Sequence, residues 1–202
     1  MMTSRRRWIR CLAGAGLLAL AVRAPAGAAL VRKPATPEAV IRTWPAAQRA
    51  VSRALIEKYG PPGQYDAHAL AWFNNGPWKR TVVYRKGRRR SARGTYRDFL
   101  QQTVGYIVPD DKIAALRKFD RRLEVSPTAG ELSFTSDREA TNLLALNLAD
   151  EIVVGKRSVA GARAYFAKSA RLAASGKSSP YRERLRFGVD NSRYMTPTGG
   201  DR

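Results

Sequence analysis

The sequence is poor in the residues on which most enzymes and metal sites depend. It has one cysteine, Cys11, which excludes an internal disulfide framework and a cysteine-ligated zinc site. It has one histidine, His68, so multi-histidine metal ligation is excluded and one imidazole is present for acid–base chemistry. Patterns for phosphate loops, dinucleotide binding and nucleophile elbows are missing. We therefore predict no catalytic residue, no metal and no cofactor.

Acidic residues are scarce as well. Asp and Glu total 16 against 37 Lys and Arg, which gives the 202-residue chain a formal net charge of +21. Hydrophobic residues make up 44%, too many for a disordered chain and too few for a protein with several membrane spans. The length suits one domain. These counts predict a single, strongly basic globular domain.

Residues 1–28 have the order of regions found in a signal peptide. Arginines come first, an apolar run from Cys11 to Val22 follows, and small residues close the segment. Twelve helical residues rise only about 18 Å against a hydrocarbon core of roughly 30 Å, so a permanent span is not expected. We predict cleavage after Ala28, before Ala29, with Ala26 as the alternative.

The arginine-rich start resembles the twin-arginine export motif, in which two arginines and a variable residue precede an aromatic, an aliphatic and a cationic residue. The matching positions are Ser4, Arg5, Arg6, Arg7, Trp8, Ile9 and Arg10. The resemblance implies transient binding to the twin-arginine export machinery and bacterial export of a folded protein; an ordinary secretory signal is the alternative. Either route predicts a periplasmic or secreted protein with no transmembrane span after cleavage.

Export changes which partners the charge favours. Removal of residues 1–28 lowers the net charge from +21 to +16, because five arginines and no acidic residue are lost. Nucleic acid is the expected partner of a cytosolic protein with this charge, and export disfavours it. The partners we expect are an anionic envelope component (lipid headgroup, lipopolysaccharide or acidic glycan) or an acidic protein. A GC-rich coding bias is an alternative origin of the arginine excess.

Periodicity and capping residues divide residues 36–176 into helices and two hairpins. Thr36 and Pro37 start a short helix, and Pro45 restarts a helix that ends near Lys58. Further helices are predicted over 96–104, 110–119, 138–154 and 158–176, with a possible strand at 105–108 and a second hairpin of strands near 122–125 and 132–134. The predicted fold class is α+β, a small antiparallel sheet from two β-hairpins packed against four to five helices.

The chain ends are predicted to lie outside this domain. Residues 29–35 read as an extended lead-in after the cleaved signal helix. Residues 177–202 are rich in Ser, Pro, Gly and Arg, which predicts a disordered basic tail.

The first hairpin is predicted over residues 68–73 and 78–85. Pro77 has no backbone N–H to close a two-residue turn, which favours a four-residue loop at 74–77. That register pairs Phe73 with Trp78 and Ala71 with Arg80. It divides the side chains into two faces: Phe73, Trp78, Val82 and Tyr84 on one, and His68, Leu70, Trp72 and Val83 on the other.

Two segments of this domain, 72–81 and 142–153, resemble an uncharacterised family of bacterial exported proteins with a domain of unknown function. The family pattern covers roughly Ile41 to Phe166. Its members often have His at the position of Phe73 and a less basic segment at the position of residues 85–93. The resemblance implies a domain boundary and no particular chemistry.

Polar, aromatic and cationic side chains gather at the first hairpin and at the basic run that follows it. Indoles stack on sugars or lie at lipid interfaces, amides bind hydroxyls, and cations bind anions. The candidate binding residues are Trp72, Asn74, Asn75, Trp78, Lys79, Arg80, Arg88, Arg89 and Arg90. Alternatively, Trp72 and Trp78 pack in the core, Asn74 and Asn75 serve the turn, and residues 85–93 form a solvated loop.

Other polar residues have a structural interpretation beside a functional one. Lone His68 is more typical of a structural position than of a catalytic base. Glu124 with Asp150 is a conceivable pair of glycosidase carboxylates, which would have to converge from separate elements. Asn147 lies among leucines, so we expect its amide to bind a neighbouring element.

Two functions compete at this point. The first is an exported, non-catalytic envelope protein that binds an anionic surface or partner through a basic face and the Trp72–Arg80 hairpin. The alternative is a small periplasmic hydrolase or glycan-active enzyme with an unrecognised site. The net positive charge and the absence of recognisable catalytic motifs favour the first function.

Overall fold

The computed structural model describes residues 36–90 and 96–189. The predicted signal peptide, its export motif and cleavage residues, and the lead-in 29–35 lie outside the described residues. So do residues 91–95, which include the end of the basic run 85–93, and residues 190–202 of the predicted tail. All described residues belong to one unit, Lys33–Arg202.

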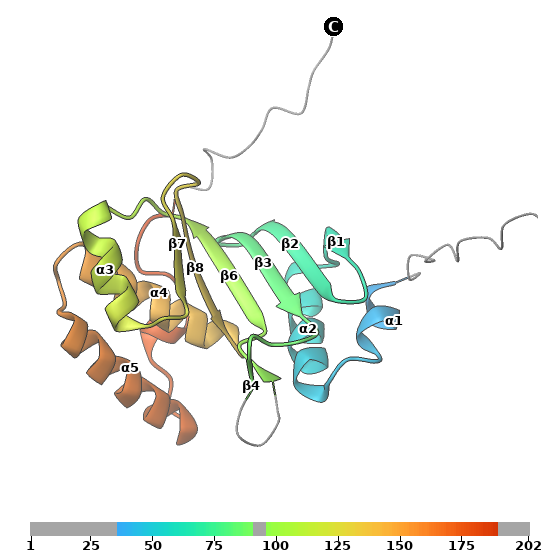
Figure 1. Ribbon diagram of the computed structural model, residues 1–202. Helices are drawn as coiled ribbons and strands as arrows, with labels where there is room; N and C mark the ends of the chain where they lie inside the picture. The colour runs from blue at the N-terminus through green and yellow to red at the C-terminus, as the bar shows by residue number, and fades with distance from the viewer. Residues whose placement is uncertain (1–35, 91–95, 190–202) are drawn as a thin grey trace, which may run out of the picture. The chain divides into compact units, whose positions relative to one another are not determined.

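A six-stranded antiparallel sheet organises this unit, with strand order β1-β2-β3-β6-β8-β7 (Figure 1). The strands of this sheet are β1 (Gln64–Tyr65), β2 (Ala69–Asn75), β3 (Trp78–Tyr84), β6 (Leu100–Gly105), β7 (Leu123–Ser126) and β8 (Glu131–Ser136). A separate two-stranded ribbon pairs β4 (Arg89–Arg90) with β5 (Tyr96–Arg97). The α+β class is confirmed, and the sheet is larger than two hairpins.

Five α-helices accompany the sheet: α1 (Pro37–Ile41), α2 (Ala46–Tyr59), α3 (Asp110–Phe119), α4 (Glu139–Val153) and α5 (Val159–Ala174). The hydroxyls of Thr36 and Ser158 cap α1 and α5, as their positions predict. In Figure 1, α2 and α4 lie behind the sheet, and the other face is turned to the viewer. Across 36–90 and 96–189, no helix has the length and hydropathy needed to cross a bilayer.

Two hydrophobic clusters hold the helices on the sheet. The first packs Trp44 and Leu55 against Leu70, Trp72 and Val83 of the β2–β3 hairpin. The second joins the leucines of α4 to β6, β7 and β8 and to α3 and α5. Every helix therefore contributes to the core on one face, and the opposite face of the sheet has no helix among the described residues.

The register of the first hairpin differs from the prediction by two residues. Asn75 pairs with Trp78 and Phe73 with Arg80, so the loop is Gly76-Pro77. Gly76 has φ +61°, and proline fixes φ near −65°, which suits a two-residue turn of type II′. The proline nitrogen lies inside the loop, so no ladder donor is lost.

The prediction that Trp78 lies on the same face of the hairpin as Phe73 is also wrong. Asn74 has a left-handed φ of +50°, which interrupts the side-chain alternation at the end of β2. Asn75 and Trp78 are buried beyond it, whereas Phe73 is 47% exposed on the open face. Leu70, Trp72 and Val83 share the helix-covered face as expected.

The segment 96–104, predicted as a helix, instead contains strand β5 and all of strand β6 except Gly105. All six residues of β6 are buried, because the strand lies in the middle of the sheet between β3 and β8. A strand that is buried on both faces does not show the apolar–polar alternation by which strands are recognised. Its pattern of apolar and polar residues can then be mistaken for the spacing of a helix. Tertiary pairing decided this element.

The basic run is not only a loop. Arg89 and Arg90 form β4, which pairs with β5 through Arg89↔Arg97 and Arg90↔Tyr96. Gly87 lies so close to the Arg97 backbone that an added Cβ would be 2.2 Å from its carbonyl oxygen. The ribbon therefore requires glycine at this position.

The predicted disorder of the tail is wrong for residues 177–189. A short 3-10 helix, Pro180–Arg182, lies against α4. Leu185, Phe187 and Val189 pack on the second cluster, and Phe187 meets Tyr106 edge-on with ring centroids 5.2 Å apart. Composition indicated disorder, but a few apolar side chains with a buried anchor suffice to order the segment.

Glu139, the first residue of α4, joins four elements. Its Oε1 accepts hydrogen bonds from Tyr59 OH at 2.6 Å, Trp78 Nε1 at 2.7 Å and Gln102 Nε2 at 3.0 Å. Its Oε2 lies 2.7 Å from Lys58 Nζ. The carboxylate thus ties α2, β3 and β6 to the start of α4, where negative charge also favours the helix dipole.

The pKa of Glu139 predicts sensitivity to acid. Burial opposes its charge, but hydrogen bonds from Lys58, Tyr59 and Trp78 outweigh burial and hold the pKa below its usual value. A carboxylate with a depressed folded-state pKa stabilises the fold above its unfolded pKa, and the contribution is lost as pH falls. We expect the free energy of unfolding to fall below about pH 4.

Urea unfolding between pH 7 and pH 3 measures this effect. Glu139→Gln should be less stable at pH 7 and lose less stability on acidification than the parent chain. Exposed Glu57→Gln is the matched control and should keep the parental slope. An unchanged acid dependence in Glu139→Gln would show that this carboxylate does not titrate as inferred.

Candidate functional site

The two indoles of the predicted binding surface lie in the core. Trp72 is 2% exposed, and its Nε1 donates to the Gly60 carbonyl oxygen at 2.9 Å. Trp78 is fully buried and donates to Glu139. Both indole N–H groups are therefore engaged inside the protein, and the core alternative holds for these two residues.

The two cations of the hairpin are neutralised within the fold. Lys79 Nζ lies 2.7 Å from one carboxylate oxygen of Glu131, and Arg80 Nη2 lies 3.2 Å from the other. Burial opposes the Glu131 charge, but the two cations prevail and lower the pKa of Glu131. Asn75 is buried and donates to Thr81, which leaves Asn74 as the exposed amide of the turn.

Of the three candidate arginines in the basic run, Arg88 is the one whose side chain the structure describes. Arg88 forms an ion pair with Glu124, and Glu124 also accepts from Gln101 Nε2 at 2.9 Å. Arg89 and Arg90 are placed by their backbone pairing in β4. The structure therefore disperses the predicted binding residues between the core, the Glu131 ion pairs and the Glu124 ion pair.

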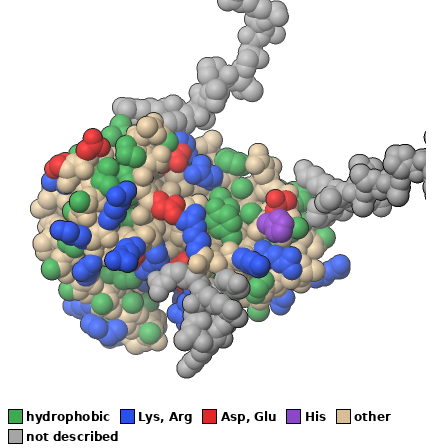
Figure 2. Space-filling view, viewed as in Figure 1, with side chains coloured by type: hydrophobic (Ala, Val, Ile, Leu, Met, Phe, Trp, Pro, Cys, Tyr) green, Lys and Arg blue, Asp and Glu red, His purple; other side chains and the backbone are tan. Residues whose placement is uncertain are grey.

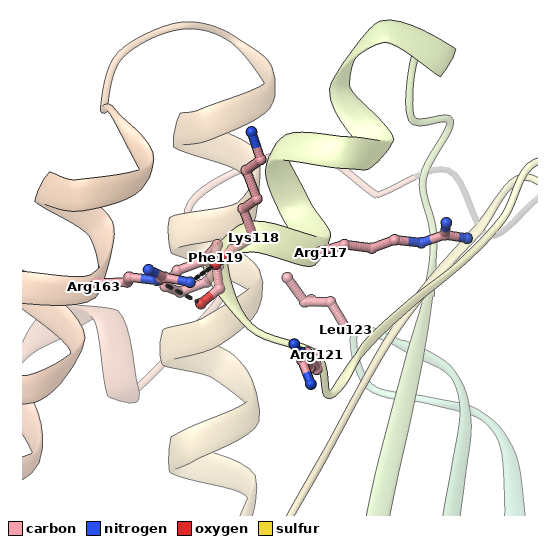
Figure 3. Close-up of a pocket in the computed structure, with 6 residues that line it drawn as sticks. All are labelled: Arg117, Lys118, Phe119, Arg121, Leu123 and Arg163. Atoms are coloured by element: carbon pink, nitrogen blue, oxygen red, sulfur yellow. Dashed lines mark hydrogen bonds between the residues drawn. The ribbon is translucent and has the colours of Figure 1, made fainter.

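A different group of cations surrounds a pocket of about 560 Å³ at the end of α3. This basic pocket is lined by Arg117, Lys118, Phe119, Arg121, Leu123 and Arg163 (Figure 3). All four cations are exposed, while Phe119 and Leu123 are buried and form its apolar floor. The lining contains no carboxylate.

Three elements bring these cations together. Arg117 and Lys118 belong to the last turn of α3, Arg121 precedes β7, and Arg163 reaches across from α5 (Figure 3). Arg163 donates to the carbonyl oxygens of Lys118 and Phe119, the latter at 3.3 Å, and so caps the end of α3. The capping bonds hold one guanidinium in place at the pocket.

The charge around the basic pocket is uncompensated. Among the described residues, no ion pair involves Arg117, Lys118, Arg121 or Arg163. Figure 2 shows Lys and Arg side chains gathered on the side of the molecule built by α3 and α5. Figure 3 shows the four cationic chains extending in different directions around the floor, so they surround an area and do not converge on one point.

A second pocket, of about 470 Å³, adjoins the first and shares Arg121 with it. This polar pocket is lined by Arg88, Asp98, Asp120, Arg121, Arg122, Glu124 and Thr135. It contains as many arginines as carboxylates. Arg122 contacts Asp120 at 2.7 Å and Asp98 at 3.4 Å, and its guanidinium lies 4.7 Å from the centre of the Phe134 ring.

The remaining candidates have structural surroundings. His68 is exposed, and its backbone N–H donates to Asp66 at 2.7 Å. Glu124 lies on the open face of β7, whereas Asp150 lies on α4 behind the sheet and accepts from Tyr106 OH at 2.8 Å. These two carboxylates therefore do not converge, and the glycosidase alternative has no carboxylate pair here.

Asn147 behaves as predicted and binds a neighbouring element. Its Nδ2 donates to the carbonyl oxygens of Tyr181 at 3.0 Å and Arg184 at 2.8 Å. Its Oδ1 accepts from the Arg186 backbone N–H at 2.7 Å. Within 36–90 and 96–189, no group of three or more His, Cys, Asp or Glu side chains is placed to hold a metal ion.

Sequence reasoning missed the basic pocket, although part of its signal was present. Arg117, Lys118, Arg121 and Arg122 fall within six residues, a density close to that of the 85–93 run. These positions were assigned to a helix end and a strand start, where charge is usually solvated. Arg163 is 42 positions after Arg121, and only the packing of α5 on α3 brings it to the pocket.

Comparison with known proteins adds no relative to this description. No family model, no curated protein and no solved structure matches the chain.

Proposed function

We propose that this chain is an exported, non-catalytic bacterial envelope protein that binds an anionic component through the basic pocket. The observation that carries the proposal is the set of four exposed cations around an apolar floor, with no carboxylate in the lining. Cations that have no internal partner keep their full attraction for an external anion. The Trp72–Arg80 hairpin, the first candidate surface, is replaced in this role by the basic pocket.

Comparison of the cations within the fold supports this choice. Lys79, Arg80 and Arg88 already face carboxylates, so an incoming anion would compete with Glu131 or Glu124 for them. Arg117, Lys118 and Arg121 have no such competitor among the described residues. An anionic ligand is consequently expected to bind more favourably at the basic pocket than at the hairpin or at Arg88.

The spacing of the cations favours an extended anion over a single small ion. Their chains leave the pocket in different directions, so one phosphate or carboxylate would meet only part of the set (Figure 3). A polymer or surface with repeated charges engages several at once, which multiplies the attraction and makes it depend on salt. Lipid headgroups, lipopolysaccharide and acidic glycans all have repeated charges, and the resemblance of the N-terminal segment to an export signal supports exposure to them.

Charge reversal at the pocket tests the proposal. We expect the full-length chain to bind polygalacturonate or vesicles rich in anionic lipid, with affinity that falls as salt rises. Arg117→Glu combined with Lys118→Glu should weaken binding about tenfold or more, because two attractions become repulsions. Titration at low and high salt, followed by intrinsic fluorescence or calorimetry, measures the affinity.

The matched control reverses two exposed cations outside the pocket, Arg53 on α2 and Lys168 on α5. Arg53→Glu with Lys168→Glu changes the net charge by the same amount and should retain most of the affinity. Equal losses in both double variants would mean that net charge attracts the anion and the pocket does not. Failure of the parent chain to bind either probe at low salt would overturn the proposed function.

A further inference from the structure

The polar pocket differs from the basic pocket in its charge balance, although the two share Arg121. We infer that the ligand is an acidic saccharide, with its carboxylates or phosphates over the basic pocket and its hydroxyls in the polar pocket. The inference rests on the proposed function, since it names the class of anion that the basic pocket takes. It adds a second subsite with a different chemistry.

Internal pairing in the polar pocket disfavours a charged occupant. Arg88 is paired with Glu124, and Arg122 is paired with Asp120 and Asp98. A charged ligand would be attracted by one member of each pair and repelled by the other, and would have to break the pair to gain a partner. A neutral hydrogen-bonding ligand meets no such opposition.

The ion-paired side chains of the polar pocket can form further hydrogen bonds, and hydroxyl groups are suitable partners for them. A carboxylate accepts about four hydrogen bonds and a guanidinium donates five, so each retains open positions after forming one pair. Hydroxyls both donate and accept, and neighbouring sugar hydroxyls can meet a carboxylate and a guanidinium together. A lining rich in Arg side chains paired with Asp or Glu therefore suits a polyhydroxylated group better than an apolar or singly charged one.

Thr135 provides an independent indication of a ligand. Its side chain lines the polar pocket, the residue is only 2% exposed, and its Oγ1 has no hydrogen-bond partner among the described residues. A buried hydroxyl without a partner costs free energy, which a ligand hydroxyl in the pocket would relieve.

Several contacts position the side chains that form the wall of the polar pocket. Asp120 and Asp98 fix Arg122 from two sides, and its guanidinium stacks on Phe134. Gln101 of β6 donates to Glu124 of β7 across the intervening strand β8, and Tyr84 OH in turn donates to Gln101 at 3.2 Å. Preorganised groups lose little freedom on binding, which is the condition for recognising weakly interacting hydroxyls.

A pair of probes with equal charge separates the two subsites. Tetragalacturonate and tetraglutamate each have four side-group carboxylates, and only the saccharide has ring hydroxyls. We expect the full-length chain to bind tetragalacturonate more tightly than tetraglutamate. Thr135→Val should weaken tetragalacturonate binding about three- to tenfold, the effect of one hydrogen bond, and leave tetraglutamate binding unchanged.

Ser169→Ala is the matched control, since Ser169 is also buried with an unpartnered hydroxyl but lines neither pocket. It should leave both affinities unchanged, and urea unfolding verifies that Thr135→Val is folded. Equal affinity for the two probes, or a parental affinity for tetragalacturonate in Thr135→Val, overturns the saccharide inference and leaves anion binding intact. Absence of binding to both probes overturns the proposed function with it.

Discussion

Replacement of Glu139 by alanine is expected to lower the free energy of unfolding by about 3 to 5 kcal/mol. The carboxylate is the common acceptor for Tyr59, Trp78 and Gln102. Trp78 and Gln102 are fully buried, so their N–H groups cannot turn to water once the acceptor is gone. Each unsatisfied buried donor costs about 1 to 3 kcal/mol, which accounts for most of the expected loss.

Chemical denaturation monitored by tryptophan fluorescence measures this loss. Glu57→Ala on α2 is the control; its side chain is exposed, and the change should stay within about 0.5 kcal/mol. Glu139→Gln retains one acceptor oxygen and should lie between the parent and Glu139→Ala. A loss under about 1 kcal/mol in Glu139→Ala would show that water or another acceptor satisfies the donors.

Replacement of Asn147 by alanine is expected to release residues 177–189 and to lower the free energy of unfolding by about 2 to 4 kcal/mol. Asn147 is 2% exposed and is the polar anchor for three backbone groups of this segment. Without it, the segment would be held by the packing of Leu185, Phe187 and Val189, by the pairing of Tyr181 with Glu151, and by the contacts of Ser179 and Tyr181 with Tyr165.

Hydrogen exchange together with limited proteolysis distinguishes this local release from general destabilisation. Amides of 177–189 should lose protection in Asn147→Ala while those of the central strand β6 keep theirs at low denaturant. Thr141→Ala on the same helix is the control, since its side chain makes no hydrogen bond to the described part of the segment. Retained protection of the Arg186 amide, whose acceptor is Asn147, would contradict the anchoring role.

The predicted hairpin site failed because its residues satisfy one another or the core. Lys79 and Arg80 meet Glu131, which lies 51 positions beyond Arg80 in the sequence. Trp78 meets Glu139, 61 positions away. A local cluster of polar and aromatic residues therefore indicates a binding surface only when these side chains do not bind residues from distant parts of the chain. Pairing between residues so far apart leaves no pattern in the local sequence.

The basic pocket likewise depends on contacts between residues that are far apart in the sequence. The high density of cations in residues 117–122 is evident from the sequence. In the fold, however, Arg122 forms ion pairs with Asp120 and Asp98, whereas no ion pair of Arg117 or Arg121 is found among the described residues. The polar pocket likewise joins residues of β7 and β8 with Arg88 and Asp98 from the β4–β5 region. Neither pocket is encoded in a contiguous motif.

The sequence alone determined the elements whose signals are local. The caps Thr36 and Ser158, the prolines at 45 and 109 and the stop at Gly60 place α1, α2, α3 and α5, and alternation around Leu132 and Phe134 predicts the β7–β8 hairpin. These signals act within one or two turns of chain, where backbone geometry and side-chain capping suffice.

Only the tertiary structure decided the identity of β6, the register at Gly76-Pro77, the order of residues 177–189 and the division of cations into paired and unpaired sets. Each depends on a partner far along the chain: β3 and β8 for β6, Asn147 for the C-terminal segment, Glu131 for the two hairpin cations and Glu124 for Arg88. Burial and electrostatic pairing are properties of proximity in space, and proximity between distant residues arises only when the chain has folded.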